Sequence, residues 1–265
     1  MKAGISTASL FLRRDNKQAL ELFNRFSVAS AEVFLTTFSE YETDFVSTLD
    51  RGRVEVNSIH VLNTQFEPQL FASHEKVRED AYFWLKKALA CAQILGAKYY
   101  TFHGTARYKL ASRNPANDNF LKWRKDFAQI AQTCESYGVT LCLENVEWAT
   151  YNRVGVFEQL APYVPTLKGV LDVKQARLSG QDYRKYLTEM GQKLAYVHIS
   201  DVNAQGKMCL PGKGEFNFNE LISRLKDVGF DGALIIEAYE KDYQDEQELK
   251  QSYDYINELI YKNHA

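Results

Sequence analysis

Short apolar runs alternate with longer stretches of mixed polarity along nearly the whole chain. The apolar runs predict eight strands, at Lys2–Ser6, Ala31–Leu35, Val54–His60, Lys98–His103, Val139–Glu144, Gly169–Asp172, Leu194–Ser200 and Ala233–Glu237. Between most of these runs, apolar residues recur at positions i, i+3, i+4 and i+7, which is the spacing of a helix with one buried face. One such stripe contains Val77, Ala81, Trp84, Leu85, Ala88, Leu89 and Ala92. The chain is therefore predicted to alternate strands with helices.

Glycine ends several of the predicted helices just before a strand, at Gly96, Gly138 and Gly229. Glycine is the usual residue for the left-handed position that closes a helix. Repeated strand–helix units imply an α/β protein with a parallel sheet. Eight such strands in 265 residues fit one closed (β/α)8 TIM barrel, with residues 1–265 forming a single domain. An open doubly wound sheet is the alternative, but the glycine-rich nucleotide loop typical of that fold is missing after the first strand.

Charge and composition exclude some classes of partner. The formal net charge is −2, and no basic stripe is evident, which disfavours a protein whose main task is to bind nucleic acid. No apolar stretch reaches the length of about 18 residues expected of a membrane span, and no signal peptide is recognised at the start. The four cysteines form no C-x-x-C pair, which favours a reducing compartment. We expect a cytoplasmic protein that contacts neither membranes nor nucleic acid.

Six of the eight predicted strands finish at or near a histidine or an acidic residue, namely His60, His103, Glu144, Asp172, His198 and Glu237. In a barrel the carboxyl ends of the strands form the rim on which catalytic residues lie. Any one of these residues might instead form a turn or cap a helix. So many acids and histidines on one rim have no such common explanation, and they indicate a functional site.

Electrostatics narrows the chemistry of this rim. Several carboxylates close together at a poorly solvated barrel mouth repel one another unless they are protonated or bridged by a cation. A divalent metal ion removes that conflict. A set of carboxylates and imidazole without thiolate suits Mn²⁺, Mg²⁺, Co²⁺ or Zn²⁺ in a reactive site, and it is unlike a structural zinc site.

The strand ends also resemble a known group of proteins, the sugar phosphate isomerase/epimerase superfamily of xylose-isomerase-like TIM barrels. The similar segments are Leu143-Glu144-Asn145, Leu171-Asp172-Val173, Tyr196–Asp201 and Ile235-Ile236-Glu237, together with the loop Leu210–Glu215, which is similar to a P-G-x-G turn of that group. The resemblance covers nearly the whole chain, with the segments in the expected order. It implies a metal-dependent enzyme of carbohydrate metabolism.

By position, the resemblance implies one divalent metal ion on Glu144, Asp172, His198 and Glu237. Mn²⁺ or Zn²⁺ is the first expectation, with Mg²⁺ or Co²⁺ as alternatives. The substrate would be a small keto-sugar or a related polyol. Glu144 and Glu237 would exchange a proton at the carbon next to the carbonyl, through an enediolate.

Further residues are expected to contact the substrate, namely His60, His103, Trp148, Lys174, Gln175 and Lys213. Each of these residues also has an interpretation without contact to a substrate. For Lys213 the alternative is a solvated loop residue, and for the two histidines it is a hydrogen-bonded position on the rim. Trp148 might wall the apolar face of a sugar or simply pack.

Other reactions remain open on the same site. A dehydratase or lyase acting on an inosose-like substrate would expel a β-hydroxyl from the same enediolate, and it is the second choice. An AP-endonuclease-like hydrolase is less favoured because Gln175 stands where that group has a metal-binding histidine. A non-catalytic sugar-binding role is weaker still. The expected partner is a small carbohydrate, and the sequence allows a homo-oligomer without indicating one.

Overall fold

The computed structural model describes residues 1–105 and 120–264. Its centre is a closed barrel of parallel strands in the order β1-β10-β7-β6-β5-β4-β3-β2. The barrel strands are β1 Lys2–Ser6, β2 Ser30–Leu35, β3 Glu55–Val61, β4 Tyr99–Phe102, β5 Thr140–Glu144, β6 Lys168–Asp172, β7 Leu194–Ile199 and β10 Ala233–Ile236. The predicted (β/α)8 barrel is confirmed, and each strand differs from its predicted bounds by one residue at most at either end.

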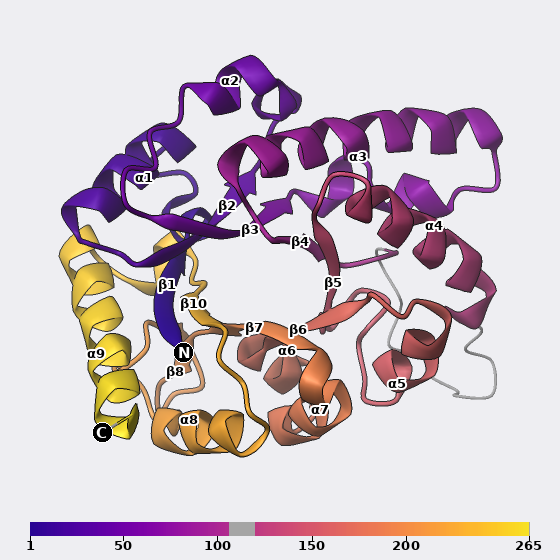
Figure 1. Ribbon diagram of the computed structural model, residues 1–265. Helices are drawn as coiled ribbons and strands as arrows, with labels where there is room; N and C mark the ends of the chain where they lie inside the picture. Colours follow the sequence, from indigo (N-terminus) through magenta and orange to yellow (C-terminus); the bar gives the residue numbers. More distant parts are fainter. Residues whose placement is uncertain (106–119, 265) are drawn as a thin grey trace.

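Helices surround the barrel on all sides (Figure 1). The α-helices are α1 Asn16–Arg25, α2 Thr43–Ser47, α3 Glu75–Leu95, α4 Arg124–Glu135, α5 Val156–Leu160, α6 Val173–Leu178, α7 Tyr183–Met190, α8 Phe218–Asp227 and α9 Glu246–His264. Short 3-10 turns are η1 Thr7–Leu10, η2 Phe38–Tyr41, η3 Asn63–Gln65, η4 Glu67–Phe71, η7 Phe120–Trp123, η8 Ala161–Tyr163, η9 Gly191–Lys193 and η10 Glu240–Asp242. A two-stranded antiparallel sheet of β8 (Asp201–Val202) and β9 (Met208–Cys209) follows β7.

The local sequence explains where helices end and strands begin. The stripe predicted in α3 is largely buried, as Ala81, Leu85 and Ala88 show. The helix ends at Gly96, whose φ of 71° is the left-handed conformation that glycine adopts without a steric penalty. The chain then turns directly into β4, so the glycine fixes where the next strand begins.

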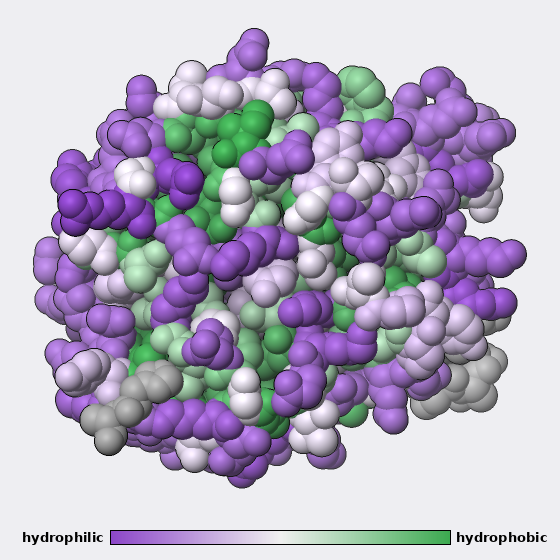
Figure 2. All heavy atoms as spheres, viewed as in Figure 1, coloured by the Kyte–Doolittle hydropathy of each residue, from purple (hydrophilic) through white to green (hydrophobic). Residues whose placement is uncertain are grey.

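The surface of the molecule is mixed in character. Figure 2 shows hydrophilic residues over most of the outline, with hydrophobic residues between them toward the middle and the upper part of that face. No helix in the two described ranges is both long enough and apolar enough to cross a membrane.

Candidate metal centre and substrate cavity

The carboxyl ends of four barrel strands bring together the residues that the sequence marks as metal ligands. Glu144 and Asp172 are the last residues of β5 and β6. His198 lies one residue before the end of β7, and Glu237 directly follows β10. One potential ligand atom from each residue lies within 4.8 Å of those of the other three. His198 Nδ1 is 2.9 Å from Glu144 Oε1 and 3.4 Å from Glu237 Oε2.

The geometry and the donors fit one divalent ion. Bonds from such an ion to oxygen or nitrogen are about 2.0–2.2 Å, so ligand atoms on opposite sides of it lie about 4.0–4.4 Å apart. Asp172 Oδ1 accepts a hydrogen bond of 2.9 Å from the backbone N–H of Gln175. Asp172 Oδ2 is buried and has no hydrogen-bond donor among the described residues. A buried carboxylate oxygen without a donor is costly, and a cation would satisfy it.

A buried lysine already lies beside two of these acids. Lys174 is 4% exposed, and its Nζ is 3.9 Å from Asp172 Oδ2 and 3.7 Å from Glu237 Oε2. The same ammonium lies 4.6 Å from the ring centre of Tyr239, a cation–π distance. Burial alone would lower the pKa of Lys174, but the adjacent Glu237 and Asp172 raise it above its usual value. Lys174 is therefore a permanent positive charge at the edge of the cluster.

The pKa values of the ligands themselves follow from burial and from their neighbours. Burial is the main cause that raises the pKa of Asp172 to about 7. The nearby glutamates add to this rise, whereas Lys174 opposes it. Burial would also raise the pKa of Glu144, but the rings of His198 and His103 hold the pKa of that carboxyl well below its usual range. For His198 burial opposes the charge, yet the surrounding glutamates raise its pKa well above the usual value. Without a metal ion, protons balance part of the negative charge of this centre.

Beneath the centre, on the inside of β2, lies a further acid. Glu32 is fully buried, and its Oε1 is 3.1 Å from His198 Nε2 and 3.5 Å from His60 Nδ1. Four hydroxyl groups donate hydrogen bonds to its carboxylate, those of Ser6, Ser58, Thr101 and Tyr196. Burial would raise the pKa of Glu32, but the two histidines lower it well below the usual value. Glu32 thus faces one side of His198 while the other ring nitrogen faces the metal ligands.

His60 and His103 connect this interior to the cavity above. Their Nε2 atoms are 3.2 Å apart, and His103 Nε2 is 2.8 Å from Glu144 Oε2. These two histidines and Glu144 also form a group with ligand atoms within 4.8 Å of one another. Behind His103, the buried Glu67 lies 3.9 Å from its Nδ1 and accepts hydrogen bonds from Asn63 and Tyr100. The histidines are therefore held by acids on both sides.

A cavity of about 240 Å³ opens above the candidate metal centre. Glu144, Glu237, Lys174, His60, His103 and Gln175 give it a polar floor. Its walls are mainly apolar and aromatic and include Ala8, Phe11, Phe34, Val61, Leu62, Val146, Trp148 and Tyr239. A few convergent polar groups in an apolar cleft are typical of a site for a small molecule.

The structure brings together five of the six residues expected to contact a substrate. Trp148 lines the cavity and makes an edge contact with the His103 ring, at 5.2 Å between ring centres. Gln175 also lines it, and its side-chain oxygen accepts a hydrogen bond from the backbone N–H of Glu147. Lys213 is different, because it is exposed on the turn after β9 and is not among the described residues that line this cavity.

The positions of Glu32 and of the aromatic walls Phe11, Phe34 and Tyr239 are not expected from the sequence. A signal for Glu32 was available, since a lone acid inside the apolar run Ala31–Leu35 is unusual. Phe11 and Tyr239 lie in loops, where no periodicity indicates which way a side chain points. Their position depends on how the loops fold over the rim.

Comparisons with known proteins assign the chain to a family. A family model described as the xylose isomerase-like TIM barrel matches residues 18–259. The chain belongs to this family. Curated relatives are distant: an uncharacterized protein of Methanocaldococcus jannaschii is 25% identical over 80% of this chain and 74% of its own length. The fructoselysine 3-epimerase of Escherichia coli O157:H7 is 24% identical over 62% of this chain and 60% of its own length.

Several solved structures share the fold at low identity. The IOLI protein with a bound zinc atom superposes with a TM-score of 0.76 at 18% identity, covering 99% of both chains. D-psicose 3-epimerase of Clostridium cellulolyticum H10, solved with D-tagatose, gives 0.77 at 16% identity over 98% of this chain and 99% of that one. The probable 3-DHS dehydratase AsbF of Bacillus anthracis gives 0.74 at 16% identity, over 96% and 98%.

Proposed function

We propose that the protein is a divalent-metal-dependent isomerase or epimerase of a small keto-sugar or a related polyol. The observation that carries this proposal is the convergence of three carboxylates and one imidazole at the floor of a substrate-sized cavity. The epimerases among its relatives and structural neighbours support it. The donor set favours Mn²⁺ or Zn²⁺, with Mg²⁺ or Co²⁺ as alternatives.

The metal ligands Glu144, Asp172, His198 and Glu237 would hold the ion. When bound, a divalent ion supplies Lewis acidity that polarises a substrate carbonyl and makes the neighbouring C–H group more acidic. All remaining steps fall to side chains of the chain itself.

Glu237 is the better placed base of the two catalytic glutamates. Its side chain is 13% exposed and faces the cavity, whereas Glu144 is only 2% exposed. Both oxygens of Glu144 are also engaged, Oε1 with His198 and Oε2 with His103. We therefore assign removal of the proton to Glu237 and delivery of a proton to the opposite face of the carbon to Glu144. Because Glu144 is ionised at rest, the proton that it delivers would first pass to it from the ring of His103, its hydrogen-bonding partner.

The cavity walls suit the remaining parts of a sugar. Lys174 and Gln175 present polar atoms that can hydrogen-bond to hydroxyl groups, and His60 lies within the same floor. Trp148 and Phe34 offer flat apolar surfaces to the C–H face of a sugar. Exclusion of water by these rings strengthens the polar contacts beneath them.

The test follows exchange of hydrogen at carbon. Metal-reconstituted protein is incubated in D₂O with a panel of keto-sugars and inososes, and incorporation of deuterium next to the carbonyl is measured by NMR. Glu237→Gln should reduce exchange by at least about 10²-fold, because an amide cannot accept the proton. A substrate should still bind to the variant.

Glu240→Gln is the matched control, since Glu240 lies three residues further along in η10 and does not line the cavity. Equal exchange in the parent protein and Glu237→Gln would remove Glu237 from the base role. Metal content near one ion per chain is expected by elemental analysis. Content near three zinc ions would instead support the hydrolase alternative.

Dehydration is the second candidate on the same site. The probable 3-DHS dehydratase among the structural neighbours supports this alternative. The same NMR panel separates the two reactions, since dehydration yields a product lacking one water rather than a deuterated isomer.

A further inference from the structure

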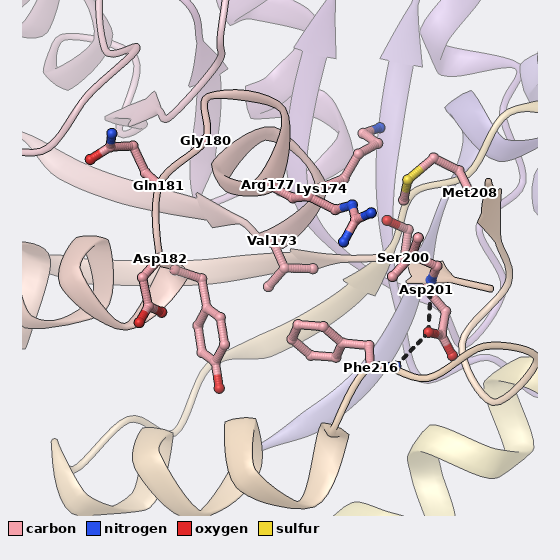
Figure 3. A pocket seen from close by; sticks show the side chains of 12 residues that line it. Val173, Lys174, Arg177, Gly180, Gln181, Asp182, Ser200, Asp201, Met208 and Phe216 are labelled. Atoms are coloured by element: carbon pink, nitrogen blue, oxygen red, sulfur yellow. Dashed lines mark hydrogen bonds between the residues drawn. The ribbon is translucent and has the colours of Figure 1, made fainter. Parts of the chain in front are cut away.

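A second cavity, of about 280 Å³, lies beside the metal centre but opens separately from it. Figure 3 shows it between α6, the segment that joins α6 to α7, and the start of β8. Lys174 is the one residue found in the lining of both cavities among the described residues. Its side chain points away from this second cavity, toward the acids of the metal centre (Figure 3). Val173, Met208 and Phe216 provide apolar surface.

At least three hydrogen-bond donors at this cavity lack a partner in the described ranges, namely those of Arg177, Tyr183 and Ser200. Arg177 is exposed, and its guanidinium makes neither a hydrogen bond nor an ion pair with any described residue, so it is free to bind a ligand that enters from solvent; Arg184 on the next helix instead binds Asp182 and Glu220. Ser200 is 4% exposed, and its hydroxyl has no partner among the described residues. In Figure 3 the Arg177 and Ser200 side chains face the same part of the cavity. Buried hydroxyl groups normally have a partner, so this one indicates a missing acceptor.

The acids that line the cavity are already engaged and leave Arg177 unpaired. Asp201 accepts hydrogen bonds from the backbone N–H groups of Val202, Gly212, Gly214 and Phe216, at 2.7 to 3.0 Å. Asp182 caps α7 and pairs with Arg184 at 3.0 Å. These bonds also fix the wall, because three of the contacts of Asp201, to Gly212, Gly214 and Phe216, hold the turn after β9 in one conformation. A fixed wall reduces the entropy lost when a ligand binds.

We propose that this second cavity binds the phosphate or carboxylate group of a small organic molecule. A guanidinium offers N–H groups only, and together with a free hydroxyl it matches a ligand that accepts hydrogen bonds and carries negative charge. The volume of about 280 Å³ lies just below the range of about 300–1,000 Å³ for drug-sized ligands, which suits one anionic group with a short carbon skeleton. The apolar residues beside the two donors would contact that skeleton.

The position relative to the metal centre suggests how such a group would be used. Lys174 and Arg177 are three residues apart on α6, so they lie on the same side of that helix about one turn apart. Lys174 reaches the candidate metal ligands and Arg177 reaches the second cavity. The anionic group is therefore either the far end of the substrate or part of a separate molecule that binds next to it.

The test measures binding of inorganic phosphate to the full-length, metal-free protein by calorimetry. Phosphate should bind to the parent protein, and Arg177→Gln should weaken binding by at least about tenfold, the size expected for a charged hydrogen bond. Ser200→Ala should weaken it by roughly threefold to tenfold. Lys185→Gln is the matched control, because Lys185 is exposed on α7, does not line the cavity and carries the same charge. It should bind phosphate like the parent.

Absence of phosphate binding at about 50 mM, a free energy of binding weaker than about −2 kcal/mol, would overturn the proposal. Equal weakening by Arg177→Gln and Lys185→Gln would overturn it as well. Competition on the Mn²⁺-loaded protein then identifies the source of the anion. If phosphate competes with D-fructose 6-phosphate but not with D-fructose, the cavity holds the anionic end of the substrate. If it competes with neither, the cavity holds a separate anion. Mn²⁺ affinity should be unchanged in Arg177→Gln, so a failed metal centre and a failed anion site are distinguishable.

Discussion

Glu32→Gln removes one negative charge from the interior of the barrel without changing the size of the side chain. In the parent protein the carboxylate accepts hydrogen bonds from four hydroxyl groups and lies 3.1 Å from His198 Nε2. The amide keeps one acceptor oxygen but directs two N–H groups toward groups that were themselves donors. The hydroxyls can turn to accept, whereas the neighbouring histidines lose the acid that stabilises their charged form.

Loss of one partner from a buried ion pair typically costs about 3–5 kcal/mol. Because part of the hydrogen bonding survives, we expect about 3 kcal/mol for Glu32→Gln. A change of 1 kcal/mol shifts Tm by about 2–4 °C in a domain approaching this size, so Tm should fall by about 6–12 °C. Removal of the acid that orients a metal-binding histidine usually weakens metal binding by about 10–100-fold. Mn²⁺ affinity should therefore fall as well.

Differential scanning calorimetry of the metal-free protein and Mn²⁺ titration of both proteins measure these effects. Glu55→Gln provides the control, because Glu55 begins the neighbouring strand β3, is 39% exposed and pairs with Lys2 and Lys98 at the surface. Exposed pairs contribute about 0–1 kcal/mol, so this variant should unfold close to the parent. If Glu32→Gln unfolds like Glu55→Gln and binds Mn²⁺ with parental affinity, Glu32 neither supports the fold nor orients His198.

Two further predictions concern the charge at the metal centre. Mn²⁺ affinity should rise by at least about tenfold per pH unit between pH 5.5 and 7, because the pKa of Asp172 is raised to about 7 and that of His198 well above its usual value, so that protons on both ligands compete with the ion; affinity that is constant from pH 5.5 to 7 would contradict this, as measured by titration calorimetry. Lys174→Met should make Mn²⁺ raise Tm by more than it does in the parent, since the ion then replaces a lost cation beside Asp172 and Glu237. An equal rise in both proteins would show that Lys174 does not share their charge.

The barrel could be predicted from sequence because its signals are local. Apolar runs such as Leu194–Ser200 stand between stretches with helical spacing, and Gly96 marks a boundary that only a left-handed residue closes well. In a closed barrel the carboxyl ends of all strands meet at one rim. Because the ends of the strands could be predicted, it could also be predicted that Glu144, Asp172, His198 and Glu237 lie close together.

What the sequence did not reveal depends on loops and on the interior of the barrel. The turn that carries Lys213 is fixed by bonds from Asp201 to backbone groups up to fifteen residues away, and no sequence pattern reports those bonds. They leave Lys213 exposed rather than over the cavity. Similarly, Glu32 gains its role only when the strands close around it, because its partners come from β1, β3, β4 and β7.

The centre combines buried acids and buried bases in a way that explains how it can exist before a metal ion binds. Glu32, Glu144, Asp172 and Glu237 face His60, His103, His198 and Lys174 across a few ångströms. The pKa of His60 is raised to about 9: burial lowers it, but Glu32 and the other glutamates outweigh that effect. Because the pKa of His60 is higher in the folded than in the unfolded protein, the charged ring stabilises the fold. This contribution is complete below about pH 6.5 and is lost as pH rises through about 9. In the metal-free protein, protons thus neutralise the negative charge that a divalent ion would otherwise neutralise. Protons and the metal ion must therefore compete for the same carboxylates.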